Sequence, residues 1–361
     1  MIDKKVVVVA TGGTIAMKYD PEKDGLVPAC TGEDLAAAVP ELANVAPLEF
    51  IQFSNIASPA MTPQNMWDLH IKLEEVLARD DVAGAIVTHG TDTLEETSYF
   101  LDLLHNGPKP IVTTAAMRGA GDTSPDGPMN ILSAVRTAAS SQAVGLGVMV
   151  CLNETLHAPA EVTKTHSANP ATFQSPWWGQ IGYVDSDRVV IRRKPLNVVR
   201  FAPKTLTARV DLIKCMTGST RDYIDFAVSQ GCQGIVIEGY GRGNVPPGMV
   251  PGIEDAVKAG VAVVLTTRTP GGRVLDVYGY PGSVTDTGRA GLAMGGEISR
   301  QSPTETHDRA FGETEFGNRP KRSRENFRHL RRFVVCEPTP LVHKVNIVWL
   351  ADAFVSGTIA V

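Results

Sequence analysis

Short runs of apolar residues alternate with turns rich in glycine and threonine along most of the chain. Six such runs stop at a polar turn: VVVVATGGT, GAIVTHGTD, KPIVTTAAMRG, VGLGVMVCLNET, GIVIEGYGRGN and VAVVLTTRTPGG. Continuous apolar runs of this length are typical of parallel strands that are buried on both faces. We therefore predict a strand at each of these places.

Helical patterns lie between the predicted strands. The clearest is MTPQNMWDLHIKLEEVLARDD, where Thr62 is placed to cap a helix that Pro63 begins. Five of its apolar residues share one stripe at helical spacing: Met66, Leu69, Leu73, Val76 and Leu77. Alternating strands and helices predict an α/β fold, with a doubly wound, mostly parallel sheet in a larger N-terminal domain and a smaller α/β C-terminal domain. Ligands bind such sheets beyond the carboxyl ends of the strands, where the threonine and glycine turns lie.

Changes in composition indicate where the domains end. Residues 192–213 contain Pro195 and Pro203, mixed charge and weak periodicity, as in a linker. We therefore expect an N-terminal domain over 1–191 and a C-terminal domain over 214–294. From 295 to 361 the periodicity is lost and basic residues gather: Arg319, Lys321, Arg322, Arg324, Arg328, Arg331 and Arg332. A solvated segment explains such a run more often than a tail that binds nucleic acid.

Composition and charge narrow the class of protein. A content of 43% hydrophobic and 20% charged residues is ordinary for a soluble enzyme, and a net charge of -5 gives no reason to expect nucleic acid or an anionic membrane as a partner. No Cys-x-x-Cys pair occurs, so we expect reduced, buried thiols at all five cysteines: Cys30, Cys151, Cys215, Cys232 and Cys336. The run Val6–Ala10 is too short for a signal peptide, and no stretch of 18 apolar residues occurs. A soluble, cytoplasmic protein is therefore expected.

Two of the predicted strand ends carry a threonine that could take part in chemistry. Thr14 follows two glycines in ATGGTIA, and Thr91 precedes Asp92 in HGTDT. Either turn could simply cap the next helix, and the first lacks the glycine pattern of a nucleotide site. A hydroxyl becomes a nucleophile beside a general base, and Lys164 in EVTKTHSANPATF can act as one. His89 is expected to make structural hydrogen bonds, because no second metal ligand stands at a suitable spacing.

The combination of these segments is more specific than any one of them. ATGGTIA and THGTDTLEETSYFLDL are similar to the two signature motifs of the bacterial-type L-asparaginase/glutaminase family. The resemblance continues, in order, through SNIASPAMTPQNMW, AMRGAGDTSPDGPMN, EVTKTHSANPATF, GIVIEGYGRGN and TTRTPGG, and covers roughly residues 4–282. It implies a cytoplasmic enzyme that hydrolyses L-asparagine, a small amino-acid substrate, to L-aspartate and ammonia through a threonine acyl-enzyme, without a metal or organic cofactor. Activity on glutamine stays open, because one methylene is worth only about 1–3 kcal/mol in a pocket.

The resemblance also implies roles for particular residues. Carried over by motif, Thr14 would be the nucleophile. Thr91, Asp92 and Lys164 would form a second catalytic group, with Lys164 relaying protons to Thr91. Asp92 would also hold the α-ammonium group of the substrate, and Ser58 in NIASPAM would bind its α-carboxylate.

Other positions match the family less completely. Asn244 in GYGRGN matches a position that reaches the site of a neighbouring subunit, which implies a homodimer or homotetramer. The lid tyrosine of the family falls near Gly25, where Tyr19 is the nearby candidate. The family also supplies a glutamate from its second domain, and no glutamate lies between Glu254 and Glu297, so this partner is unassigned.

The end of the chain departs from the family, which normally finishes with a helix resembling K-A-R-L-K-L-M-I-A-L. Residues 301–311 here read QSPTETHDRAF. These residues can be encoded by a set of codons that, translated in the reading frame shifted by one base, gives the sequence of that helix. We therefore hypothesise a frameshift near residue 295, which resequencing of the gene would test. The unmatched glutamate and altered end leave a second interpretation, a non-catalytic or defunct amino-acid-binding relative. A third, the amidase subunit of a tRNA-dependent amidotransferase, would normally carry an extra N-terminal domain, for which Thr14 stands too near the start.

Overall fold

A computed structural model describes most of the chain as two compact units, which divide between Leu206 and Thr207. The described residues are 3–13, 17–20, 22, 25–28, 39–195, 200–206 and 208–295. The basic run and the hypothesised frameshift therefore lie outside the described residues. Val210–Lys214 forms strand β13, so the linker expected over 192–213 is shorter than predicted. These residues belong to the sheet of unit 2 because they pair in parallel with β14, Gly234–Gly239.

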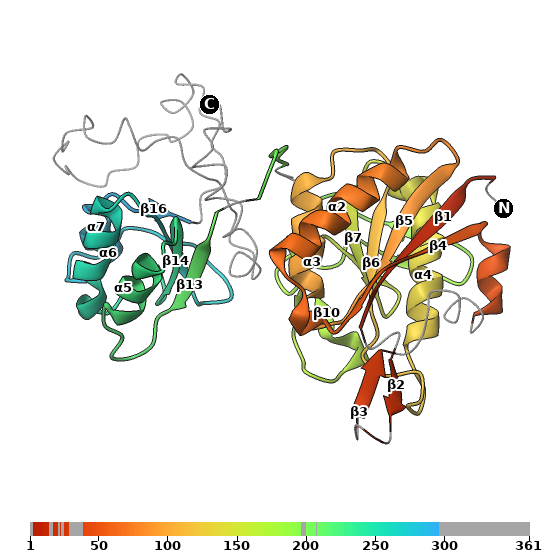
Figure 1. Ribbon diagram of the computed structural model, residues 1–361, viewed down its shortest axis with the longest axis horizontal. Helices are drawn as coiled ribbons and strands as arrows, with labels where there is room; N and C mark the ends of the chain where they lie inside the picture. Colours follow the sequence, from red (N-terminus) through yellow and green to blue (C-terminus); the bar gives the residue numbers. More distant parts are fainter. Residues whose placement is uncertain are drawn as a thin grey trace, which may run out of the picture. The chain divides into compact units, whose positions relative to one another are not determined.

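Unit 1 is built on an eight-stranded sheet with the order β12-β11-β8-β7-β6-β5-β1-β4 (Figure 1). Its parallel strands are β4 (Leu48–Ile56), β1 (Lys5–Gly12), β5 (Val82–Thr88), β6 (Ile111–Thr114) and β7 (Val148–Leu152). The antiparallel strands are β8 (Thr155–His157), β11 (Gly182–Val184) and β12 (Val189–Ile191). Four of the predicted apolar runs are confirmed as β1, β5, β6 and β7. Strand β4 was not predicted, because it is an edge strand with mostly half-buried residues and no continuous apolar run.

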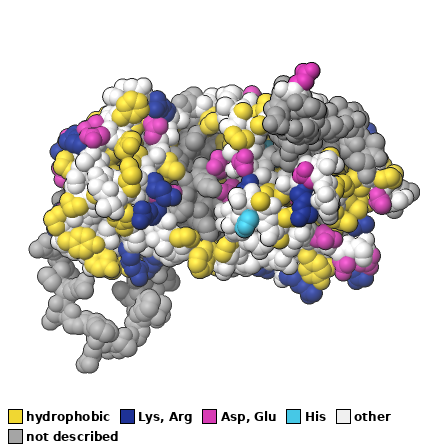
Figure 2. Space-filling view, turned by 90° about the horizontal axis from the view of Figure 1, so that it is seen from below, with side chains coloured by type: hydrophobic (Ala, Val, Ile, Leu, Met, Phe, Trp, Pro, Cys, Tyr) yellow, Lys and Arg dark blue, Asp and Glu magenta, His cyan; other side chains and the backbone are white. Residues whose placement is uncertain are grey.

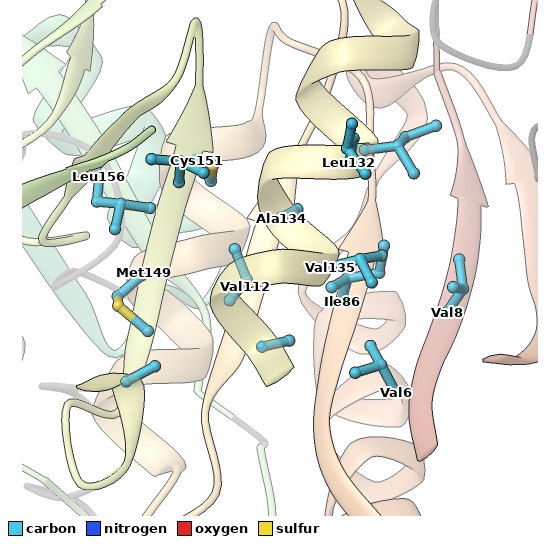
Figure 3. Close-up of a cluster of buried hydrophobic side chains, with 14 of the residues drawn as sticks. Val6, Val8, Ile86, Val112, Leu132, Ala134, Val135, Met149, Cys151 and Leu156 are labelled. Atoms are coloured by element: carbon cyan, nitrogen blue, oxygen red, sulfur yellow. The ribbon is translucent and has the colours of Figure 1, made fainter. Parts of the chain in front are cut away.

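Helices cover both faces of this sheet. Helices α2 (Pro63–Leu77) and α3 (Leu94–Leu104) lie on one face, and α4 (Gly127–Ala139) lies on the other (Figure 1). Successive strand residues point to opposite faces. Figure 3 shows one set, in which Val6, Val8 and Ile86 face α4, while Val7, Val9 and Val87 pack in a separate cluster with residues of α2 and α3. Burial on both sides explains why these strands read as unbroken apolar runs.

Helix α2 begins and packs as its sequence predicts. The Thr62 hydroxyl accepts a hydrogen bond from the Asn65 amide at 3.2 Å, and the Asn65 side-chain oxygen accepts one from the Thr62 amide at 3.0 Å. This reciprocal pair is a capping box, which satisfies amides at the start of the helix. The predicted stripe is also confirmed, because the buried residues of α2 are Met66, Leu69, Leu73, Val76 and Leu77.

Two short hairpins and several single turns complete the described part of unit 1. The hairpins pair β2 (Met17–Asp20) with β3 (Gly25–Pro28), and β9 (Thr163–Lys164) with β10 (Phe173–Gln174). The 3-10 turns are η2 (Pro40–Asn44), η3 (Ser58–Ala60), η4 (Ser141–Ala143) and η5 (Pro170–Thr172).

Unit 2 is a smaller α/β unit with a four-stranded parallel sheet in the order β13-β14-β15-β16. Its remaining elements are β15 (Ala262–Thr267), β16 (Ala293–Met294), η6 (Pro247–Met249), α5 (Asp222–Ser229), α6 (Val250–Lys258) and α7 (Val284–Gly288). Strands β14 and β15 confirm the last two predicted runs. Both units together thus confirm the predicted α/β fold.

The described cysteines and the surface charges can be compared with what the composition predicts. Cys151, Cys215 and Cys232 are buried and free, as predicted, whereas Cys30 and Cys336 lie outside the described residues. On the face shown in Figure 2, the described basic and acidic side chains are interspersed. None of the described helices is long and apolar enough to cross a membrane.

Candidate active site

The candidate site lies where the strand order of the large sheet reverses. The chain leaves β1 for β4 on one side and later enters β5 on the other side of β1. In open α/β sheets, a ligand crevice forms at the carboxyl ends of strands at such a point. Thr91 comes three residues after the end of β5, and Thr14 comes two residues after the end of β1. Thr14 itself lies outside the described residues.

The turns after β1 and β5 touch through their backbones. Gly13 has a φ of +85°, and a Cβ built on it would lie 2.3 Å from the amide nitrogen of Gly90. A Cβ built on Gly90 would in turn lie 2.6 Å from the Ser58 Oγ. Only glycine tolerates this conformation and this approach. In the sequence, Gly13 directly precedes Thr14, and Gly90 directly precedes Thr91.

Thr91, Asp92 and Lys164 are brought together although 72 residues separate the last two. The Lys164 Nζ donates hydrogen bonds to the Thr91 Oγ1 at 2.9 Å and to the Asp92 Oδ1 at 2.7 Å. Thr91 is 7% exposed, whereas the Asp92 side chain is 59% exposed. A buried hydroxyl therefore contacts a lysine whose charge is paired with a carboxylate at the surface.

Ser58 joins the same site from the turn after β4. It is 5% exposed, and its Oγ accepts a hydrogen bond from the Asp92 amide at 3.2 Å. Its carbonyl accepts one from the Thr93 hydroxyl at 2.8 Å. Because the Ser58 Oγ accepts from a backbone amide, its own hydroxyl proton can be donated elsewhere.

The structure does not support the alternative in which Asp92 or Thr93 serves only to cap α3. Thr93 occupies the cap position, but its side chain makes no cap hydrogen bond, since it bonds to Ser58. The side chains of Thr91 and Asp92 bond to Lys164 instead. The corresponding alternative for Thr14 falls outside the described residues.

His89 makes the structural hydrogen bonds that the sequence led us to expect. Its Nδ1 lies 2.8 Å from the Gly90 carbonyl oxygen, and its Nε2 lies 3.1 Å from the Thr97 Oγ1. Burial lowers the pKa of His89 to about 4, so the ring is neutral at pH 7. A carbonyl only accepts, so Nδ1 carries the proton and Nε2 accepts from Thr97. Among the described residues, no group of three or more His, Cys, Asp or Glu is placed to hold a metal ion.

Two further sequence-predicted residues, Tyr19 and Asn244, belong to other elements of the structure. Tyr19 belongs to β2, paired with Leu26 of β3, but its side chain is not among those described. Asn244 lies in unit 2, in a tight loop after β14 that is closed by hydrogen bonds between the backbones of Tyr240 and Asn244 at 2.7 and 2.9 Å. The Asn244 Oδ1 is buried and has no partner among the described atoms.

One residue of the site was missed by sequence reasoning. Glu95 on the first turn of α3 is 1% exposed, and its Oε2 accepts a hydrogen bond from the Lys164 amide at 2.8 Å. An acidic residue at the start of a helix is usually explained by its favourable interaction with the helix dipole. The sequence therefore gave no reason to expect a contact with Lys164. The available signal was its place on α3, where most residues are buried, because a carboxylate there requires a partner.

Comparisons with known proteins agree over both units. The family profile "Asparaginase, N-terminal" matches residues 5–197, and "Glutaminase/Asparaginase C-terminal domain" matches residues 209–302. An L-asparaginase of Bacillus licheniformis is 37% identical over 297 residues, which are 81% of this chain and 91% of that protein. A probable periplasmic L-asparaginase of Haemophilus influenzae is 33% identical over 306 residues, covering 82% of this chain and 85% of its own length.

A solved structure adds the fold to this similarity. The crystal structure of a probable cytoplasmic L-asparaginase from Campylobacter jejuni superposes with a TM-score of 0.72 at 30% identity, covering 80% of this chain and 89% of that one. The resemblance inferred from the motifs is thereby confirmed. The two profiles, the identities and the shared fold together establish that this chain belongs to the asparaginase family.

Proposed function

We propose that this protein is an L-asparaginase, which hydrolyses the side-chain amide of L-asparagine to give L-aspartate and ammonia. The observation that carries the proposal is the contact of Thr91 with Lys164, beside the backbone contact that adjoins Thr14. The names of the relatives from Bacillus licheniformis and Haemophilus influenzae support the same substrate.

In the first step, the Thr14 Oγ attacks the carbon of the substrate's side-chain amide. The hydroxyl proton passes to the departing nitrogen, and the C–N bond breaks. Ammonia is released, and the acyl group remains bound to Thr14 as an ester. Backbone amides of the glycine turns would bind the oxyanion, a contribution that elsewhere amounts to about 3 kcal/mol per donor.

In the second step, water attacks the ester carbon and the Thr14 oxygen leaves with a proton. Lys164 and Thr91 form the group that moves protons, because the Nζ and Oγ1 are 2.9 Å apart and a proton can pass between them. A positioned group of this kind typically contributes 10²–10⁴-fold to a rate.

The ends of the substrate would be held by Asp92 and Ser58. Asp92 presents a 59% exposed carboxylate to the α-ammonium group, and Ser58 has a hydroxyl proton to donate to the α-carboxylate. Tyr19 from the β2–β3 hairpin is the proposed lid residue. Asn244 is proposed to contact substrate from a neighbouring copy of the chain, which requires a homodimer or homotetramer.

Substrate range and location follow as lesser parts of the proposal. Some glutaminase activity is proposed, because asparagine and glutamine differ by one methylene. A cytoplasmic location is proposed from the similarity to the Campylobacter jejuni protein, and fractionation of cells would test it.

The deciding experiment measures ammonia release from asparagine and from glutamine by the purified wild type and by Thr14→Ala. We expect release by the wild type and a loss of at least 100-fold in the variant, with unchanged folding. Thr220→Ala, which removes an exposed hydroxyl of unit 2, is the matched control and should behave as the wild type. If the folded wild type released no ammonia from either amide, the proposal would be wrong and the non-catalytic interpretation would stand.

A further inference from the structure

The position of Lys164 needs an explanation, because little secondary structure holds it. Lys164 ends β9, a strand of two residues that pairs with only two residues of β10. A side chain on so short a strand must be held by other contacts if its Nζ is to stay against Thr91.

Glu95 supplies such a contact from a different element. Its Oε2 accepts a hydrogen bond from the backbone amide of Lys164 at 2.8 Å, across 69 residues of sequence. Glu95 is 1% exposed, so the contact is shielded from water, and a hydrogen bond to a carboxylate is stronger than one between neutral groups. The start of α3 also favours a negative charge at this position.

The same helix start carries the other residues that Lys164 touches. Helix α3 begins at Leu94, directly after the turn that holds Thr91 and Asp92. Lys164 is therefore attached at two points, by its backbone to Glu95 on α3 and by its Nζ to Thr91 and Asp92 in the turn before α3. Two attachments fix both the place and the direction of the side chain, which one ion pair at the surface would not do.

We propose that Glu95 is a positioning residue that holds β9 on α3 so that Lys164 reaches Thr91. The inference rests on the proposed function. Glu95 touches neither substrate nor reacting atoms in this scheme and acts through Lys164. A displacement of about 1 Å can cost about 100-fold in rate, so the loss of this hydrogen bond should appear in turnover.

The first test compares Glu95→Leu with Glu95→Gln. Leucine fills the space but cannot accept a hydrogen bond, whereas glutamine keeps an oxygen that can accept from the Lys164 amide. We expect a kcat lower by about 10- to 100-fold for Glu95→Leu with a KM within about threefold of the wild type, and substantial recovery in Glu95→Gln. Glu96→Gln removes the same charge from the same helix turn and should leave both constants unchanged.

The second test is a double-mutant cycle with Lys164→Met. If Glu95 acts through Lys164, Glu95→Leu should cause no further loss of kcat when Lys164 is already replaced. Equal losses in both backgrounds, or a lower melting temperature with normal kcat in the folded fraction, would overturn the inference. Failure of the proposed function looks different, because the wild type itself would then release no ammonia.

Discussion

Replacing Lys164 by methionine should abolish most of the activity without weakening the fold. Methionine keeps an unbranched chain of similar length, so the space beside Thr91 stays filled. The variant loses both hydrogen bonds of the Nζ, at 2.9 Å to the Thr91 hydroxyl and at 2.7 Å to the Asp92 carboxylate. We expect kcat/KM to fall by about 10²–10⁴-fold, which is the usual contribution of one acid–base group.

The structure separates this catalytic effect from a structural one. A loss of 10²–10⁴-fold corresponds to roughly 3–5 kcal/mol of transition-state stabilisation. The ion pair contributes less to folding: the Lys164 side chain is 17% exposed, but the Asp92 side chain is 59% exposed, and a pair that reaches the solvent contributes about 1 kcal/mol or less. The free energy of unfolding should therefore change by less than about 1 kcal/mol.

Steady-state ammonia release and urea unfolding, followed by tryptophan fluorescence, measure the two quantities on the same preparation. The matched control is Lys72→Met, because Lys72 also pairs with a carboxylate, Glu75, whose side chain is 59% exposed. The control should lose no activity. If folded Lys164→Met retained kcat/KM within about threefold of the wild type, Lys164 would have no part in the chemistry.

Further predictions concern the turns and one buried acid. Gly13→Ala should lower kcat at least 100-fold, because a Cβ 2.3 Å from the Gly90 nitrogen must move by about 1 Å to reach ordinary contact; near-normal kcat would refute this. Thr62→Ala should lower the free energy of unfolding by about 1 kcal/mol at unchanged activity, as measured by urea unfolding, because it removes the cap of α2. Burial raises the pKa of Asp102 to about 6, from about 3.8 in the unfolded chain. The folded state therefore binds the proton more tightly, and this group's contribution to stability falls as pH rises from 3.8 to 6. Asp102→Asn should remove that fall, so the variant gains stability relative to the wild type by about 1–3 kcal/mol between pH 4 and pH 7; parallel curves of unfolding free energy against pH would contradict it.

The fold could largely be predicted because its strands are buried on both faces. The runs Val6–Ala10 and Val82–Val87 contain no polar side chain, which leaves few alternatives to a parallel sheet. Strand β4 is not predicted because it lies at the edge of the sheet, as far as the described residues show, and most of its residues are only half-buried. Likewise, the strand at Val210–Lys214 is not predicted, because five residues that include Asp211 and Lys214 show no clear period.

The candidate site was predicted by motif, but its geometry was not. The family resemblance groups Lys164 with Thr91, but no local sequence pattern predicts their contact, because 73 residues separate them and Lys164 lies on a two-residue strand. Glu95 was overlooked for the same reason, since its partner is a backbone amide far along the chain. Contacts between distant segments depend on how the turns stack, which no local pattern encodes.

The contact of Gly13 with Gly90 has a consequence for how this site can change during evolution. The spacing of the two turns is set by main-chain atoms, which no substitution elsewhere in the site replaces. Side chains around the two turns can therefore be replaced while the glycine contact keeps the turns at the same spacing. Under the proposed function, the preference for one amide substrate over another can therefore change while the chemical step stays the same.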